Sequence, residues 1–177
     1  LYLLGGTQDP DSYVEPRSIP GVWMLDTRSH TWREIECSGE EPAELVHHTA
    51  TPLLRTKILV AGGRTPKRAL RLHVLDTELR QWCSLRLEGS CPVRRIGAAA
   101  TLVDDKLFLF GGISNYRGPR PNHRDINVLD LSGLMRIHDD VLSGDGDEEE
   151  SQHGRQLGKD ELDALVCELE GGHNAGT

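Results

Sequence analysis

The side chains best suited to chemistry in this 177-residue chain are two clusters of basic residues. A guanidinium group can hold a carboxylate or a phosphate through two parallel hydrogen bonds. Two interpretations stay open: the clusters form one patch that receives an acidic ligand, or their charges only keep the surface soluble. The first cluster consists of Arg64, Lys67, Arg68 and Arg71, and the second of Tyr116, Arg117, Arg120, His123 and Arg124.

Other reactive residue types show no pattern of a catalytic or metal site. The adjacent His47 and His48 are interpreted as structural histidines that enter a strand. The four cysteines form no C-x-x-C pair and have no histidine at metal-ligand spacing, so we expect neither a metal site nor a disulfide framework. We therefore predict no cofactor and no enzymatic activity of its own. Reduced cysteines favour a cytoplasmic location, with the nucleus as the alternative.

A sequence repeat of about fifty residues predicts the strands and turns that position these side chains. Each unit has an apolar run that ends in Gly-Gly and a second apolar run that ends in Leu-Asp. Segments 43–63 and 92–112 align at an offset of 49 without a gap. Short strands at such a period are typical of β-propeller blades. The markers are Gly5-Gly6, Gly62-Gly63 and Gly111-Gly112, then Asp26, Asp76 and Asp130, with Trp32 and Trp82 six residues after the first two aspartates.

Taken together, these markers resemble the kelch family over roughly residues 1–131. The resemblance implies an all-β fold, a kelch-type propeller arc of about three four-stranded antiparallel blades, which we place at residues 1–138. We expect three strands in the first unit, four in the second and three in the third. Arg136 stands where the third tryptophan belongs, and residues 134–138 are the candidate outer strand there. Closed propellers have four to eight blades, so the remaining blades are missing or supplied by a longer chain.

Each repeat marker has a structural explanation. A Gly-Gly pair after a buried strand allows positive φ where a Cβ would clash. An aspartate at the end of a strand can cap the following turn through its own carboxylate. Trp32 and Trp82 offer large apolar faces, and we expect both to pack between adjacent blades. None of these residues is predicted to be catalytic.

Charge divides the chain into a nearly neutral body and an acidic tail. Residues 1–131 hold 17 Lys and Arg against 16 Asp and Glu, whereas residues 132–177 hold 3 against 12, which accounts for the net charge of −8. A neutral body does not favour nucleic acid as a partner. No apolar run of about 18 residues is present, so no transmembrane helix and no membrane partner are expected.

The tail is predicted to have three parts. Residues 139–158 form an acidic linker that cannot bury apolar surface and should be disordered. Residues 159–172 carry an apolar stripe at helical spacing and are predicted to form a short amphipathic helix. Residues 173–177 should be disordered. The helix has three open interpretations: docking on the chain's own surface, binding in a partner's groove, or disorder.

The resemblance also implies where binding occurs. In kelch-like blades the loops from the second to the third strand emerge on one face, here residues 7–21, 64–71 and 113–125. Variable loops on a rigid frame are common recognition sites. We therefore expect a protein-protein interaction module, a scaffold or adaptor, whose protein partner offers an acidic segment. The acidic tail is a candidate ligand in cis.

Two enzyme-related alternatives stand beside this interpretation. The chain could be the accessory propeller of a larger enzyme, such as a tRNA-modifying enzyme of the leucine carboxyl methyltransferase type. A copper oxidase built on a propeller would need tyrosine, histidine and cysteine ligands together, and none of the three tyrosines stands with two histidines. The sequence therefore favours a binding surface over a reaction.

Overall fold

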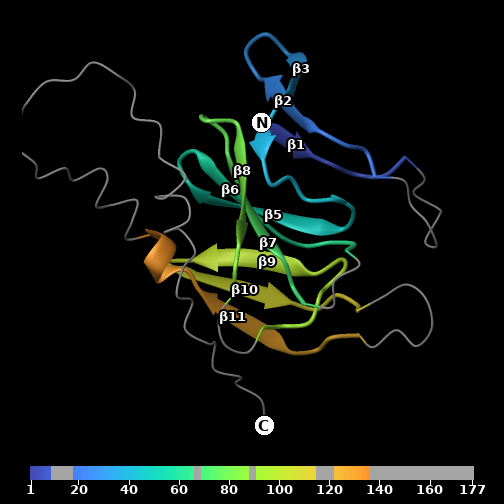
Figure 1. Cartoon of the computed structure of the whole chain (residues 1–177), viewed down its shortest axis with the longest axis vertical. Helices are drawn as coiled ribbons and strands as arrows, with labels where there is room; N and C mark the ends of the chain where they lie inside the picture. Colours follow the sequence, from blue (N-terminus) through green and yellow to red (C-terminus); the bar gives the residue numbers. More distant parts are fainter. Residues whose placement is uncertain (9–17, 66–68, 88–90, 115–121, 136–177) are drawn as a thin grey trace, which may run out of the picture.

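The chain folds into three consecutive β-sheets, which we call blades 1, 2 and 3 (Figure 1). The structure, a computed structural model, contains eleven strands in the part of the chain that it describes. This number and the order of the strands confirm the predicted all-β arc of three blades. The described residues are 1–8, 18–65, 69–87, 91–114 and 122–135.

Each blade is a meander of neighbouring antiparallel strands. Blade 1 contains β1 (Tyr2–Leu4), β2 (Val22–Asp26) and β3 (Thr31–Ile35). Blade 2 contains β5 (His48–Leu54), β6 (Lys57–Gly62), β7 (Leu72–Asp76) and β8 (Gln81–Leu85). Blade 3 contains β9 (Ala99–Val103), β10 (Lys106–Phe110) and β11 (Ile126–Asp130). The predicted count of three, four and three strands is confirmed, and the two-residue strand β4 (Ser38–Gly39) adds to β8 in parallel.

The repeated aspartates close the turns that follow the third strand of each unit. The Asp26 Oδ1 accepts hydrogen bonds from the backbone N–H of Arg28 and Ser29 at 2.8 and 3.3 Å. The Asp76 Oδ1 accepts the equivalent two bonds from residues 78 and 79, both at 2.9 Å. Because the side chain satisfies amides that the turn leaves unpaired, this motif stabilises the hairpin locally. The predicted capping role is confirmed.

The Gly-Gly pairs adopt the backbone conformation that the sequence predicted. Gly62 has φ of +73°, and a Cβ there would lie 2.5 Å from the backbone oxygen of Arg95. Gly63 follows with positive φ and donates its N–H to the same oxygen at 3.0 Å. The pair therefore allows the end of β6 to touch the segment that leads into blade 3. Any side chain at Gly62 would push the two blades apart.

Two hydrophobic clusters hold the blades together, one at each blade interface. Between blades 1 and 2, Leu4 and Val22 pack with Val60, Leu75 and Trp82. Between blades 2 and 3, one face of blade 2 packs on the leucines of blade 3. The main members of this second cluster are Leu59, Leu72, Val74 and Leu85 from blade 2, and Leu107, Leu109, Leu129, Leu131 and Leu134 from blade 3 and the segment after it.

The two tryptophans of the repeat have different surroundings, which corrects one prediction. Trp82 is 2% exposed and packs between blades 1 and 2, as expected. Trp32 occupies the same position of its repeat but is 48% exposed. The physical reason is that this side of blade 1 faces no other blade within the described residues. The expectation that Trp32 packs between blades is wrong for this structure.

The third unit departs from the expected strand pattern at its end. Residues 132–135 form one helical turn, so the described part of the candidate strand over 134–138 is not a strand. The Asp130 Oδ1 accepts a hydrogen bond from the N–H of Ser132 at 2.9 Å. The aspartate that recurs in each repeat therefore caps a helical turn here, whereas it caps a hairpin in the first two units. Leu134 is buried in the cluster between blades 2 and 3. A leucine on a helical turn thus supplies apolar surface where another blade would use tryptophan.

The ungapped alignment of residues 43–63 with 92–112 is also corrected. Strand β5 has a register irregularity between Pro52 and Leu54, whereas the pairing of β9 with β10 is regular. Leu53 is the extra residue of a β-bulge. Equivalent residues of the second and third units are therefore 50 positions apart before Leu53 and 49 positions apart after it. Leu45 precedes the bulge, so it corresponds to Arg95 of the third unit.

Several predictions concern parts of the chain outside the described residues. The acidic linker at 139–158, the helix at 159–172 and the end at 173–177 all belong to this group. Within the described part of the chain, Cys37 and Cys91 are free thiols. Among the described residues, no helix has the length and apolarity needed to cross a membrane.

Candidate protein-interaction face

Nine residues were predicted to form a binding patch, and the structure describes four of them. Arg71 and Arg124 are exposed, while Arg64 and His123 are half-buried. The other five lie outside the described residues: Lys67, Arg68, Tyr116, Arg117 and Arg120.

The stems of the two basic loops are anchored to one another through the segment that enters blade 3. Residue Ile96 of this segment pairs with Ile113 at the start of the β10–β11 loop, and Ile113 pairs with Asn122 at its end. On the other side, Val93 pairs with Ala69 of the β6–β7 loop. The segment 93–96 therefore lies between the two loops and holds the stem of each one.

Arg94 joins the two loops directly. Its Nε donates to the backbone oxygen of Ser114 at 2.7 Å, and its Nη1 donates to the backbone oxygen of Thr65. Ser114 belongs to the β10–β11 loop and Thr65 to the β6–β7 loop. A rigid guanidinium fork that bonds two carbonyls fixes their separation. The two loops that were expected to share a surface therefore share a common support.

The next residue, Arg95, anchors the far end of the β10–β11 loop from inside the protein. Its side chain is 1–2% exposed, its Nη1 donates to the Gly111 oxygen at 3.0 Å, and its Nη2 donates to Asp125 Oδ2 at 2.5 Å. The Arg95 hydrogen bond lowers the pKa of Asp125 to about 2. A buried guanidinium is costly unless it is paired, so this ion pair holds the end of the loop against the frame.

Neither arginine was singled out from the sequence, although the repeat carried a signal for one of them. Arg95 stands where the preceding unit has the buried Leu45, once the bulge at Leu53 is placed. A charged residue at a core position of a repeat indicates a partner elsewhere in the fold. The partner is Asp125, thirty positions away in sequence.

Ser114, His123 and Asp125 stand in a row that has the residue types of a hydrolytic relay. The Ser114 hydroxyl and His123 Nε2 are 2.7 Å apart, but His123 Nδ1 and Asp125 Oδ1 are 3.8 Å apart. A relay needs a hydrogen bond of about 2.6–3.2 Å at both steps. The Asp125 carboxylate instead accepts bonds from Arg95 and from the Asn127 side chain at 3.0 Å. The geometry favours a structural network over nucleophilic catalysis.

Histidine does not add positive charge to this face at neutral pH. Burial and the nearby Arg95 charge lower the pKa of His123, and Asp125 only partly opposes them. Burial likewise lowers the pKa of His48, one of the two histidines that were interpreted as structural. No group of three or more His, Cys, Asp or Glu side chains is placed to hold a metal ion within the described residues.

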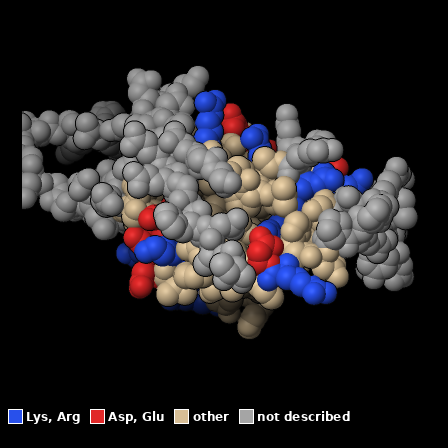
Figure 2. All heavy atoms as spheres, turned by 90° about the horizontal axis from the view of Figure 1, so that it is seen from below, with Lys and Arg blue, Asp and Glu red and all other residues tan. Residues whose placement is uncertain are grey.

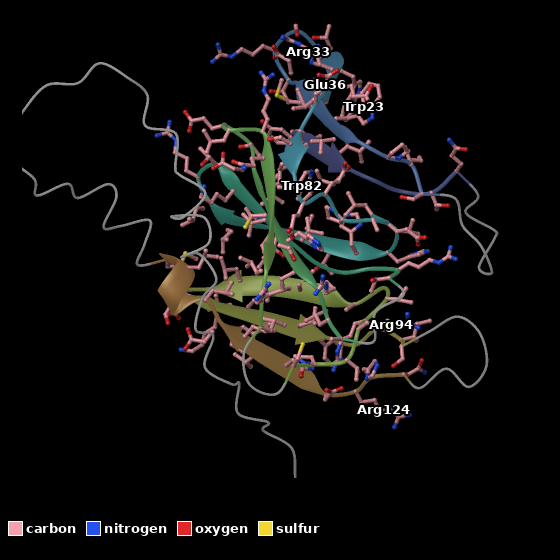
Figure 3. The ribbon with its side chains drawn as sticks, in the orientation of Figure 1. Trp23, Arg33, Glu36, Trp82, Arg94 and Arg124 are labelled. Carbon is pink, nitrogen blue, oxygen red and sulfur yellow. The ribbon has the colours of Figure 1, made fainter. Side chains whose placement is uncertain are left out.

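Arginine therefore carries the positive charge of the described loop face. The Arg64 Nε lies 3.3 Å from Glu44 Oε2, which partly neutralises it. Arg71 and Arg124 are exposed, one in each loop region. Figure 3 shows Arg94 and Arg124 at the same end of blade 3, far from Arg33 on blade 1. This end is the candidate interaction face.

Comparison with known proteins decides the family. The chain matches the family described as the KLHDC2/KLHL20/DRC7 Kelch-repeats domain over residues 1–160. The chain belongs to this kelch-repeat family. The resemblance drawn from the Gly-Gly, Leu-Asp and Trp markers is confirmed.

Curated relatives are similar over part of their length. Kelch domain-containing protein 2 of Bos taurus is 35% identical over 100 residues, which cover 55% of this chain and 24% of the relative. Kelch domain-containing protein 10 of Rattus norvegicus is 26% identical over 166 residues, covering 86% and 39%. Acyl-CoA-binding domain-containing protein 5 of Arabidopsis thaliana is 29% identical over 119 residues, covering 67% and 18%. The matched segments thus span less than half of each of these relatives.

A solved structure shares the fold. The protein described as YjhT matches with a TM-score of 0.56 and 19% identity, over 75% of this chain and 45% of its own. At this identity the likeness supports the arrangement of blades and nothing further. The loop face is therefore described as a surface carried by kelch blades.

Proposed function

We propose that this kelch domain is a protein-interaction module that binds an acidic segment of a partner protein through its loop face. The observation that carries the proposal is the pair of Arg94 hydrogen bonds, which support the β6–β7 and β10–β11 loops from one side chain. Exposed Arg71 and Arg124 then stand on a common frame. Preorganised loops lose less conformational entropy on binding than independent ones.

A carboxylate-rich segment is the partner that this chemistry favours. Arginine holds carboxylates through two parallel hydrogen bonds, and the exposed Arg71 and Arg124 are free of the burial that would hinder such a contact.

Charge reversal in both loops tests the proposal. The probe is a short fluorescent peptide made of Asp and Glu, and its Asn and Gln counterpart serves as the neutral control. We expect the double variant Arg71→Glu, Arg124→Glu to weaken binding of the acidic peptide by about 2 kcal/mol, roughly thirtyfold, and each single variant by less. Raising the salt concentration should weaken binding to wild type, because screening shortens from about 8 Å at 0.15 M to about 3 Å at 1 M.

A matched reversal on blade 1 controls for net charge. Arg28 and Arg33 are exposed and lie on the β2–β3 hairpin, away from the loop face. The double variant Arg28→Glu, Arg33→Glu changes the total charge by the same amount and should bind like wild type. Equal loss of binding in both double variants, or equal binding of the neutral peptide, would contradict a specific acidic site.

The tail gives a further arm to the experiment. Deletion of residues 139–177 removes all 12 acidic residues that follow residue 131. If the tail occupies the loop face in cis, the deletion strengthens binding of the acidic peptide. If the tail is independent of that face, binding stays unchanged while the effect of Arg71→Glu, Arg124→Glu persists.

A further inference from the structure

Opposite charges meet at the base of the loop face, where the β6–β7 loop leaves blade 2. The Arg64 Nε lies 3.3 Å from Glu44 Oε2, and the two side chains are 30% and 36% exposed. Figure 2 shows groups of acidic and basic side chains side by side on the face seen from below, so opposite charges are often neighbours on this surface. The pair of Arg64 and Glu44 is set apart by its place, because Arg64 belongs to one of the two basic clusters of the loop face.

Glu44 occupies the position in the second unit that Arg94 occupies in the third. Both residues precede the first strand of their blade, and they are fifty positions apart, ahead of the bulge at Leu53. In the third unit, the Arg94 guanidinium donates hydrogen bonds to two loop carbonyls. An ionised carboxylate has no hydrogen to donate, so Glu44 cannot hold the loop backbone in this way. It meets the side chain of Arg64 in place of a carbonyl.

The backbone beside this ion pair is fixed, whereas the ion pair itself is loosely made. The Arg64 N–H donates to the Val46 oxygen at 3.0 Å, and the preceding Gly63 N–H donates to the Arg95 oxygen at 3.0 Å. Glu44 Oε2, in contrast, is a buried atom that accepts no hydrogen bond from a described residue. Its contact with Arg64 therefore has the distance of an ion pair without the geometry of a charge-assisted hydrogen bond.

A carboxylate with better geometry can replace such a contact. Ion pairs between partly exposed side chains contribute little to stability, because water solvates both charges when they separate. A buried carboxylate oxygen that accepts no hydrogen bond lacks that solvation, so Glu44 gains hydration when it turns outward. A ligand carboxylate that approaches from solvent can accept two parallel hydrogen bonds from one guanidinium. The exchange gives Arg64 a stronger partner than the one that it has within the chain.

We propose that Glu44 is a built-in competitor for the acidic ligand of the loop face, and that the ligand binds by displacing Glu44 from Arg64. This inference rests on the proposed function, since it concerns the same acidic segment. Glu44 then determines specificity, because a ligand that offers no carboxylate to Arg64 leaves the ion pair closed. A ligand that does offer one engages Arg64 in addition to the exposed arginines, Arg71 and Arg124.

Binding of the acidic fluorescent peptide to the full chain tests the competitor. Glu44→Gln removes the competing charge and keeps the size of the side chain, so it should tighten binding by about three- to fivefold, which corresponds to about 0.7–1 kcal/mol. The matched control is Glu41→Gln, because Glu41 is exposed in the same segment and its substitution changes the net charge by the same amount. It should tighten binding by about twofold at most, because solvent and salt screen a charge that does not touch the ligand.

Removal of Arg64 separates displacement from simple repulsion. If Glu44 only repels the peptide, Glu44→Gln should tighten binding whether or not Arg64 is present. If Glu44 competes for Arg64, the gain should disappear when Glu44→Gln is combined with Arg64→Gln.

The NMR resonance of the Arg64 Nε–Hε group gives a readout that does not depend on affinity. The resonance is assigned by its absence from Arg64→Gln. It should shift in Glu44→Gln, and it should shift in wild type when the acidic peptide is added. The peptide of Asn and Gln should leave it in place. If the acidic peptide binds wild type without moving this resonance, the displacement is refuted.

Failure of this inference can be told from failure of the proposed function. If Arg71→Glu, Arg124→Glu weakens peptide binding but Glu44→Gln binds no more tightly than Glu41→Gln, the competitor is refuted and the proposed function stands. Weaker binding by Glu44→Gln also refutes the competitor, because Glu44 would then hold Arg64 ready for the ligand. If neither wild type nor Glu44→Gln binds the acidic peptide, both proposals fail. If Glu44→Gln loses the circular dichroism of the folded chain, the Arg64 resonance of wild type decides.

Discussion

Truncation of the two repeat tryptophans compares a side chain that is buried between two blades with one that is exposed. Trp82 and Trp32 follow their aspartates by the same six residues, yet Trp82 is 2% exposed and Trp32 is 48% exposed. We expect Trp82→Ala to destabilise the fold of the single chain. We expect Trp32→Ala to destabilise the fold less, since about half of the Trp32 surface already faces solvent.

The magnitude follows from the buried area. A fully buried tryptophan removes roughly 150–250 Å² from water, which at about 25 cal/mol per Å² corresponds to about 4–6 kcal/mol. Measured truncations of buried aromatic residues cost about 3–5 kcal/mol. The Trp82 Nε1 has no hydrogen-bond partner among the described residues, so Trp82→Phe should cost less than Trp82→Ala. Trp32→Ala should cost about 2–3 kcal/mol, because only about half of the Trp32 surface is buried.

Urea unfolding, followed by circular dichroism, measures both effects. The midpoint of Trp82→Ala should lie below that of Trp32→Ala, because Trp82 loses more buried area. A Trp82→Ala variant within about 0.5 kcal/mol of wild type would refute the packing argument. Equal deficits of the two variants would refute the distinction between the tryptophans.

Three further predictions concern the backbone and the ion pairs. Gly62→Ala should cost several kcal/mol more than Gly97→Ala in urea unfolding. Both positions have positive φ, which alone costs an alanine about 1–2 kcal/mol. They differ because no described atom lies within 4 Å of an added Cβ at Gly97, whereas a Cβ at Gly62 meets a backbone oxygen. Burial raises the pKa of Asp76, but the hydrogen bonds from Lys57 and two backbone amides lower it by more. The net pKa of Asp76 is therefore below 3.8. Its contribution to stability is therefore present above pH 3.8 and lost as the pH falls through the lowered pKa. Lys57→Met should reduce this acid loss in thermal unfolding. The Asp125 pKa of about 2 predicts an analogous loss between about pH 4 and 2, which Arg95→Met should flatten.

The strand order and the turns of this protein could be predicted because their causes are local. Each Gly-Gly pair and each aspartate acts on a turn within three residues of itself, as the bonds from Asp26 and Asp76 to the next amides show. A short sequence window contains both partners of such a contact. The fifty-residue period then assigned the same turns to each blade in succession.

The candidate face was predicted only in part, because its supports join distant residues. The sequence pointed to arginines in the two loops, whereas Arg94 joins Thr65 to Ser114 and Arg95 reaches Asp125. Their donors and acceptors are 16 to 30 positions apart, and which of them meet depends on how blade 3 sits on blade 2. The bulge at Leu53 hid the correspondence of Arg95 with the core position of the earlier unit.

By itself, the sequence determined the all-β repeat, the number of strands in each blade and the chemistry of the turns, since these depend on neighbours along the chain. Only the tertiary structure decided which tryptophan is buried, how the third blade ends and which arginine is a support and which is exposed. Burial is a property of the surface that a neighbouring blade covers. The same residue type at the same repeat position is therefore core in Trp82 and surface in Trp32.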